Sequence, residues 1–189
     1  MAYLTNSELK RIGFKSLGTN VKISDKASIY SPENISIGDN SRIDDFCVVS
    51  GNVTIGRNVH IAPFCLVAGG EEGIQMDDFS GLAYNVQVFS QSDDYSGRTL
   101  TNPTIPAKYK RETKRCVHLA KHVIVGAGSI IFPGVRLSEG CSVGAMSLVN
   151  KSTDPWGIYV GNPARRVKDR KKDLLALERD FLIENNKTD

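Results

Sequence analysis

Three histidines are the side chains in this chain of 189 residues that are best suited to exchange a proton near neutral pH. His118 ends a long stretch without periodicity and directly precedes the apolar Leu119, so we expect its ring to point outward beside a groove. It is therefore a candidate catalytic base. We interpret His60 and His122 as ordinary surface residues.

The cysteines and the charges narrow the class of protein. Cys47, Cys65, Cys116 and Cys141 show no Cys-x-x-Cys spacing, which favours reduced thiols over a disulfide frame or a zinc site. Up to Ala107 there are 8 Lys/Arg and 12 Asp/Glu residues. From Lys108 onward there are 16 Lys/Arg and 9 Asp/Glu residues. The basic second half suits an anionic ligand such as a polyphosphate, although a solvated basic helix is the alternative.

Other partners are not expected. The basic residues are not interleaved with aromatics, which disfavours a nucleic-acid partner. No stretch reaches the roughly 18 apolar residues of a membrane span. The N-terminus also lacks the layout of a signal peptide. We therefore expect a cytoplasmic protein.

A six-residue repeat dominates the sequence. Aliphatic residues recur in two runs, Ile37, Ile43, Val49, Ile55, Ile61 and Val67, and then Leu119, Val125, Ile131, Leu137, Val143 and Val149. Small or β-branched residues, including Cys47, Cys65 and Cys141, occupy the fourth position after the aliphatics. An amphipathic helix has a period of 3.6 residues and a half-buried strand has a period of 2 residues, so the six-residue period matches neither.

The repeat predicts a triangular solenoid whose sides take about six residues each. One large aliphatic per side fills the narrow interior, and small residues are needed near each corner because the walls converge there. Stacked coils bury a continuous core that no single coil forms alone. We predict this domain over residues 21–162.

Three segments interrupt or flank the repeat. A loop at about 90–117 has no period and is rich in polar residues, and a loop of this length is usually functional. Thr5 and Glu8 predict a capping box for a short helix that Gly13 ends, within residues 1–20. Residues 163–189 are predicted as a C-terminal helix with an apolar stripe against the solenoid, formed by Val167, Leu174, Leu177 and Phe181.

The closing segments VGAMSLV at 143–149 and VGNPARRV at 160–167 resemble those of the hexapeptide-repeat acyltransferases, in the branch of galactoside, maltose and O-antigen sugar acetyltransferases. The resemblance covers about residues 20–168. It implies a mainly β fold, a left-handed parallel β-helix, with acetyl-CoA as co-substrate, no required metal, and a homotrimer. In this family CoA lies between neighbouring solenoids, with the acceptor beneath the long loop.

The resemblance also assigns cofactor contacts. It implies that the pantetheine arm bonds to backbone groups at small corner residues, namely Gly126, Ala127, Gly144 and Ala145. A backbone N–H at Gly126 or Gly144 would stabilise the oxyanion. The alternative is that these residues only form corners. Asn150 and Lys151 would approach the adenosine, and its phosphates would meet Arg165, Arg166 and Lys168.

The catalytic position departs from the family pattern. Galactoside and maltose acetyltransferases carry a histidine after an Asn-Val strand, where this chain has Asp93 after residues 85–89. A hydroxyl acceptor needs a base of near-neutral pKa, whereas an unshifted Asp has a pKa of about 3.9. An amine is the stronger nucleophile, and Asp93 with Asp94 would hold its ammonium and accept its proton late. N-acetylation is therefore favoured over O-acetylation.

The loop is expected to choose the acceptor. The strings SDDYSG at 92–97 and TNP at 101–103 are similar to those of enzymes that N-acetylate the nucleotide-linked amino sugar GDP-perosamine for O-antigen biosynthesis. Expected acceptor contacts are Tyr84, Asn85, Asp94, Tyr95, Arg98 and Asn102.

Two other classes remain open. Zinc carbonic anhydrases share this fold, and His118 and His122 are four residues apart, but three histidines leave no spare ligand. A non-catalytic scaffold solenoid has no need for a small-residue groove that ends at Arg165. Metal analysis and acetyl-CoA binding discriminate these alternatives.

Overall fold

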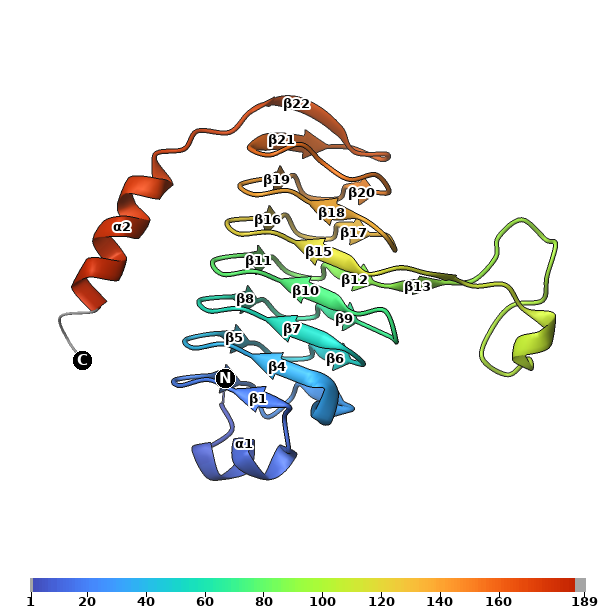
Figure 1. Cartoon of the computed structure of the whole chain (residues 1–189), viewed down its shortest axis with the longest axis horizontal. Helices are drawn as coiled ribbons and strands as arrows, with labels where there is room; N and C mark the ends of the chain where they lie inside the picture. The colour runs from blue at the N-terminus through green and yellow to red at the C-terminus, as the bar shows by residue number, and fades with distance from the viewer. Residues whose placement is uncertain (1, 186–189) are drawn as a thin grey trace.

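The computed structural model describes residues 2–185, and they form a three-sided parallel β-solenoid (Figure 1). Short strands from successive coils stack into three sheets. The predicted mainly β architecture, with parallel strands, a helix near each end and a long excursion loop, is confirmed.

The three sheets form the sides of the prism. Sheet 1 contains β1 (Ser16–Leu17), β4 (Ile35–Ile37), β7 (Val53–Ile55), β10 (Ile74–Met76), β15 (Val117–Leu119) and β18 (Arg136–Leu137). Sheet 2 contains β2 (Lys22–Ile23), β5 (Arg42–Ile43), β8 (His60–Ile61), β11 (Gly81–Leu82), β16 (Ile124–Val125), β19 (Ser142–Val143), β21 (Gly157–Val160) and β22 (Arg165–Asp169). Sheet 3 contains β3 (Ser28–Tyr30), β6 (Val48–Ser50), β9 (Leu66–Ala68), β12 (Gln87–Phe89), β17 (Ile130–Ile131) and β20 (Leu148–Val149).

The interior is filled as the repeat predicts. In most strands of the coils the aliphatic points inward and is almost fully buried, as at Ile61, Leu82 and Val125 of sheet 2. Cys47, Cys65 and Cys141 are buried in the second column, with free thiols. Two serines of this column bond within the core: Ser41 Oγ donates to the Gly56 carbonyl at 2.7 Å, and Ser129 Oγ donates to the Gly144 carbonyl at 2.9 Å.

Asparagine forms several corners. Asn20, Asn40, Asn58 and Asn85 have φ values between 51° and 58°, in the left-handed region. Asn tolerates this region better than most residues with a Cβ atom, so the chain turns tightly between short strands.

The N-terminal helix α1 (Asn6–Ile12) confirms the predicted caps. Thr5 accepts from the Glu8 backbone N–H, and the Glu8 carboxylate accepts from the Thr5 N–H at 2.7 Å. Gly13 ends the helix at φ 83°. Leu9 is buried against the first coil, so α1 closes that end of the core.

The long loop leaves the solenoid at the corner between sheets 3 and 1 (Figure 1). Its base is a two-stranded antiparallel ladder of β13 (Gln91–Ser92) and β14 (Thr113–Lys114). The lobe beyond the ladder contains a 3₁₀ turn at Ala107–Tyr109. A second 3₁₀ turn, at Pro32–Asn34, directly precedes β4.

The prediction of a helix directly after Pro163 was wrong. Residues 165–169 form β22, which runs antiparallel to β21 and covers its open edge. An exposed edge strand presents unpaired backbone groups, and pairing them outweighs the helical spacing that included Val167. Helix α2 spans Leu174–Asn185, and Glu178 ties it to Lys121 and His122. Leu177 and Phe181 line a hollow beside sheet 2 and remain 67% and 42% exposed.

Candidate functional site

A pocket of about 470 Å³ opens where the long loop leaves the solenoid, and we call it the loop pocket. Its walls come from sheet 3 and from both arms of the loop. It is lined by Ser50, Ala68, Gly70, Phe89, Gln91, Ser92, Asp93, Tyr95, Pro103 and Glu112.

Asp93 and Asp94 have different environments. Asp93 lines the loop pocket, and both of its carboxylate oxygens lie 3.3 Å from the Asn102 backbone nitrogen, which donates to them. The Asp94 carboxylate accepts from the Ser96 N–H at 2.8 Å and from the Thr99 hydroxyl at 3.1 Å. Hydrogen bonds from Ser96 and Thr99 lower the pKa of Asp94. Asp94 thus shapes the turn, and Asp93 faces the pocket.

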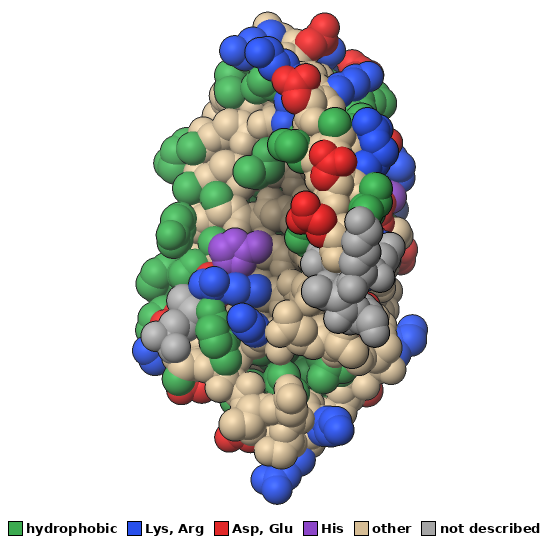
Figure 2. All heavy atoms as spheres, turned by 90° about the vertical axis from the view of Figure 1, so that its left-hand side faces the viewer, with side chains coloured by type: hydrophobic (Ala, Val, Ile, Leu, Met, Phe, Trp, Pro, Cys, Tyr) green, Lys and Arg blue, Asp and Glu red, His purple; other side chains and the backbone are tan. Residues whose placement is uncertain are grey.

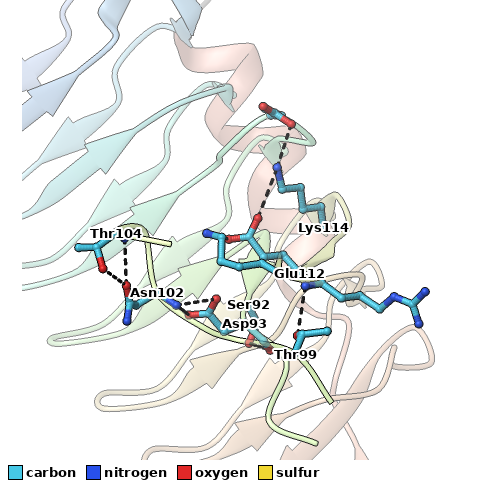
Figure 3. A network of polar contacts seen from close by, with 10 residues as sticks. Ser92, Asp93, Thr99, Asn102, Thr104, Glu112 and Lys114 are labelled. Carbon is cyan, nitrogen blue, oxygen red and sulfur yellow. Dashed lines mark hydrogen bonds and ion pairs between the residues drawn. The ribbon is translucent and has the colours of Figure 1, made fainter. Parts of the chain in front are cut away.

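Glu112 is a pocket residue that sequence reasoning missed. It lies on the opposite arm of the loop from Asp93, and its carboxylate accepts from Lys110 at 3.1 Å (Figure 3). This hydrogen bond lowers the pKa of Glu112. Lys114 joins the network between Glu112 and Glu71. The aperiodic loop sequence carried no signal for this pairing, because it depends on the β13–β14 register.

The remaining loop candidates lie at different depths. Tyr95 lines the pocket while its side chain is 90% exposed. Asn102 acts through its backbone N–H on Asp93, and its side-chain oxygen accepts from Thr104 (Figure 3). Arg98 is exposed on the lobe and does not line the loop pocket.

His118 lies outside the loop pocket. Its ring is on the outer face of β15, where Nε2 bonds to the Asp77 carboxylate at 2.8 Å and Nδ1 bonds to the Arg136 guanidinium. Arginine only donates, so the Nδ1 lone pair is already used. The structure therefore does not bring the two predicted catalytic residues together in one chain.

The predicted pantetheine residues share one corner, between sheets 2 and 3, which we call the small-residue corner: Gly126, Ala127, Gly144 and Ala145. A Cβ atom at Gly126 would lie 2.5 Å from the Ala145 nitrogen, and one at Gly144 would lie 2.5 Å from Val160 Cγ1. Stacking of the coils therefore already requires glycine at 126, where the neighbour is backbone, whereas the neighbour of Gly144 is the end of a valine side chain. The outer strip at Ala127 and Ala145 is left low and open.

Tyr84 ends the small-residue corner. The Gly128 N–H donates to the Tyr84 carbonyl at 2.9 Å, and the Met146 N–H donates to the Ala127 carbonyl at 2.8 Å. These bonds place Tyr84 one coil before Ala127. Its side chain is 63% exposed, so a large ring follows two small residues along this edge. Tyr84 and Asn85 thus lie with the cofactor candidates and not with the loop candidates.

Of the basic residues expected to contact the cofactor, only some lie at the small-residue corner. Arg165 pairs with Val160 across β21 and β22, and the Val160 side chain lies against Gly144. Arg165 therefore lies at the C-terminal end of the small-residue corner. Arg166 is engaged by Asp169, and this hydrogen bond raises the pKa of Arg166. Lys168 lies farther along β22. Asn150 and Lys151 follow β20 at the corner that leads back to sheet 1.

No three His, Cys, Asp or Glu side chains within residues 2–185 converge as ligands for a metal ion. His118 and His122 have separate carboxylate partners, Asp77 and Glu178.

Within residues 2–185, neither helix has the length and apolar character needed to cross a bilayer.

Comparison with known proteins identifies the class. A family model described as bacterial transferase hexapeptide (six repeats) matches residues 34–69. A dTDP-4-amino-4,6-dideoxy-D-glucose acyltransferase from Escherichia coli is 44% identical over 183 residues, 96% of this chain and 95% of that protein. A maltose O-acetyltransferase from Clostridium difficile 630 shares the fold at a TM-score of 0.59 and 22% identity, over 88% of this chain and 75% of its own.

Two solved structures of AntD, an N-acyltransferase from Bacillus cereus, are much more similar. One is bound to dTDP and 3-hydroxybutyryl-CoA, and a variant is bound to dTDP-4-amino-4,6-dideoxyglucose and coenzyme A. Each has a TM-score of 0.96 and 53% identity, over 97% of this chain and 98% of its own.

The chain therefore belongs to the hexapeptide-repeat acyltransferases. Within that class it belongs to the family that N-acylates nucleotide-linked amino sugars, with an acyl-CoA as the acyl donor. The predicted enzyme class, the predicted co-substrate type and the preference for an amine acceptor are thereby confirmed.

Proposed function

We propose that the acceptor is a dTDP-linked 4-amino-4,6-dideoxyhexose, whose amine receives the acyl group. The full-length similarity to an Escherichia coli enzyme named for such a sugar carries this proposal, and the AntD complexes with dTDP and with that sugar support it. GDP-perosamine, expected from the loop strings, has the same kind of amine on a different nucleotide and remains the second candidate.

Asp93 is proposed to orient the amine. The amine nitrogen attacks the thioester carbonyl, the C–S bond breaks, and CoA leaves as a thiolate. The nitrogen loses one proton, which Asp93 accepts late and which then passes to the thiolate. Asp93 suits this role because it faces the loop pocket while the Asn102 N–H holds its carboxylate in place.

The acyl-CoA is proposed to lie along the small-residue corner. Arg165 at its C-terminal end suits the phosphates, since guanidinium groups pair well with phosphate oxygens. The low strip at Ala145 and Ala127 suits the pantetheine arm, and Tyr84 marks where the thioester would stop. Arg166, Lys168, Asn150 and Lys151 are secondary candidates because they lie off this line.

A homotrimer would complete the site. The outer face of sheet 3 carries half-buried apolar side chains at Val48, Leu66, Ile130 and Leu148, as a face around a threefold axis requires. The small-residue corner and the loop lie on opposite edges of sheet 3. If sheet 3 faces the axis, the loop pocket of one chain meets the small-residue corner of its neighbour.

A cytoplasmic location fits the proposed substrates, which are all soluble nucleotides.

The experiment is a thiol-release assay with acetyl-CoA and 3-hydroxybutyryl-CoA, run against a panel of nucleotide sugars. The panel contains dTDP-4-amino-4,6-dideoxyglucose, GDP-perosamine and the matched sugars with a 4-hydroxyl. We expect the dTDP amino sugar to give the highest kcat/KM and a product heavier by one acyl group. A higher kcat/KM with GDP-perosamine would overturn the choice of nucleotide, and faster acylation of a 4-hydroxyl sugar would contradict the role of the amine.

A further inference from the structure

Gly81 leaves an unusual gap on the outer face of sheet 2. It occupies an outward strand position between His60 of β8 and Ile124 of β16. A Cβ atom there would meet only the His60 carbonyl oxygen, at an ordinary 3.5 Å, and φ at Gly81 lies outside the left-handed region. Packing therefore does not require glycine here. Glycine within a strand weakens it and often marks the close approach of a ligand.

The gap is part of a pocket of about 330 Å³ that we call the sheet 2 pocket. Most of its lining is apolar or small: Ala62, Gly81, Leu82, Ala83, Tyr84 and Ile124. The one ionisable ring other than Tyr84 is His60. Figure 2 views the molecule from the side of α2 and shows a hollowed strip with hydrophobic side chains along one margin and a histidine at its rim.

The pocket adjoins the end of the small-residue corner. Tyr84 belongs to both, since it lines the pocket and lies one coil before Ala127. Under the proposed function, an acyl-CoA that follows the corner from Arg165 brings its thioester to Tyr84. The acyl chain then has the sheet 2 pocket directly beside it.

His60 is held in a fixed orientation. Its Nε2 lies 2.8 Å from the Asp44 carboxylate, whose side chain is 2% exposed. Arg42 donates to both oxygens of that carboxylate, at 2.6 Å to Oδ1 and at 3.0 Å to Oδ2, the oxygen that His60 contacts. Within residues 2–185, no hydrogen bond engages His60 Nδ1. With the Nε2 proton donated to Asp44, Nδ1 is a hydrogen-bond acceptor.

We propose that the sheet 2 pocket is the acyl-chain site and that it selects a four-carbon acyl group with a hydroxyl substituent over acetyl. The apolar wall at Ile124 and the space above Gly81 hold the acyl chain, and His60 Nδ1 accepts a hydrogen bond from its hydroxyl group. This inference rests on the proposed function and adds the identity of the acyl group and the residues that read it.

The test compares acetyl-CoA, butyryl-CoA and 3-hydroxybutyryl-CoA with one amino-sugar acceptor, for the full chain and for Gly81→Ala and Gly81→Val. We expect kcat/KM for both four-carbon donors to fall about tenfold or more with Gly81→Val, and less with Gly81→Ala, because filling a pocket by a few methyl groups has effects of this size. The acetyl-CoA value should change less than about threefold. Ser36→Val, which adds the same side chain to the outer face of β4, is the matched control.

His60→Ala tests the hydroxyl contact separately. We expect it to lower the preference for 3-hydroxybutyryl-CoA over butyryl-CoA by roughly fivefold, the usual effect of one neutral hydrogen bond. Rejection of both four-carbon donors by the unaltered chain, or equal losses for all donors in Gly81→Val, would overturn the proposal while leaving acetyl transfer intact. Absence of transfer from every donor would instead contradict the proposed function and the inference with it.

Discussion

Asp93 and Asn102 are joined across the lobe of the long loop, because the Asn102 backbone N–H donates to both carboxylate oxygens of Asp93 at 3.3 Å. The contact closes a ring of loop residues on itself. It also leaves the Asp93 carboxylate facing the loop pocket in a defined direction. A proton acceptor that must meet an amine at one geometry benefits from this restraint.

Asp93→Asn is expected to lower kcat by about 100-fold, since loss of a positioned proton acceptor has effects of this order. The amide keeps the size of the side chain and one oxygen for the Asn102 N–H, so the loop should stay folded. Steady-state kinetics with the amino sugar and circular dichroism check both points. Asp94→Asn is the comparison, and it should affect KM for the sugar more than kcat because Asp94 bonds within the turn. Equal kcat values for Asp93→Asn and the unaltered enzyme would exclude the proposed role.

Arg165→Ala is expected to raise KM for acyl-CoA by roughly tenfold while kcat changes little, because charged hydrogen bonds contribute about 1.5–3 kcal/mol. The decisive measurement repeats the comparison with dephospho-CoA thioesters. If Arg165 contacts the 3′-phosphate, Arg165→Ala should not raise KM for the dephospho donor. Lys168→Ala, farther along β22, should show a smaller effect with either donor.

Mixed assemblies of two variants test whether each site of the proposed homotrimer is shared between neighbours. Asp93→Asn alters the loop, and Ala145→Trp fills the small-residue corner at an exposed position, so each variant alone should be nearly inactive. Subunits mixed at equal amounts after unfolding and refolding should recover about a quarter of the sites, because a loop and a corner without substitutions then meet at that frequency. Activity that stays at the level of the separate variants would place the loop and the corner of one site in the same chain.

Glu178→Gln is expected to destabilise the docking of α2 in a pH-dependent way. Burial alone would raise the pKa of Glu178, but hydrogen bonds from Lys121 and His122 outweigh burial and lower it. A lowered folded pKa gives stability that is present above the unfolded value of about 4.3 and is lost as pH falls through the folded value. Urea unfolding at pH 7 should show a free energy of unfolding that is lower by about 1–3 kcal/mol in the variant. This difference should become smaller towards pH 3. A loss that is constant over this pH range would contradict the ion-pair account.

Leu119→Ala is expected to destabilise the chain by about 2–5 kcal/mol, the usual cost of a cavity in a packed core. Leu119 is fully buried in β15, directly after the long loop. The exposed Leu100 provides the matched control, since Leu100→Ala removes the same atoms from the lobe. Urea midpoints at constant m-value measure the difference.

The architecture was predictable because the six-residue period is a physical requirement at every coil. Ile61, Leu82 and Val125 fill equivalent inward positions on successive coils, so each coil shows the six-residue repeat again in the sequence. Strand β22 was not predictable in this way. Its residues pair with the open edge of β21, and no periodic feature of residues 165–169 records that edge.

The candidate site was predictable only in part for a related reason. Asp93 and Arg165 were identified through motif resemblance, which does not say which residues meet in space. Glu112 lines the same pocket as Asp93 because Gln91 pairs with Lys114 and Ser92 with Thr113 across the loop base. His118 is adjacent to the loop in sequence, yet its ring lies on sheet 1 between Asp77 and Arg136. Sequence proximity alone did not predict either outcome.

The solenoid ladder continues across the long loop without a change of register, since Ile74 pairs with Val53 on one side and with Val117 on the other. The loop is therefore an insertion that the coils tolerate, attached by one short ladder at a corner. Such a module can be exchanged between related chains without changing the register of the coils. Under the proposed function, the loop carries the acceptor pocket with Asp93 and the coils carry the acyl-CoA corner, so recognition of the two substrates is divided between separable segments.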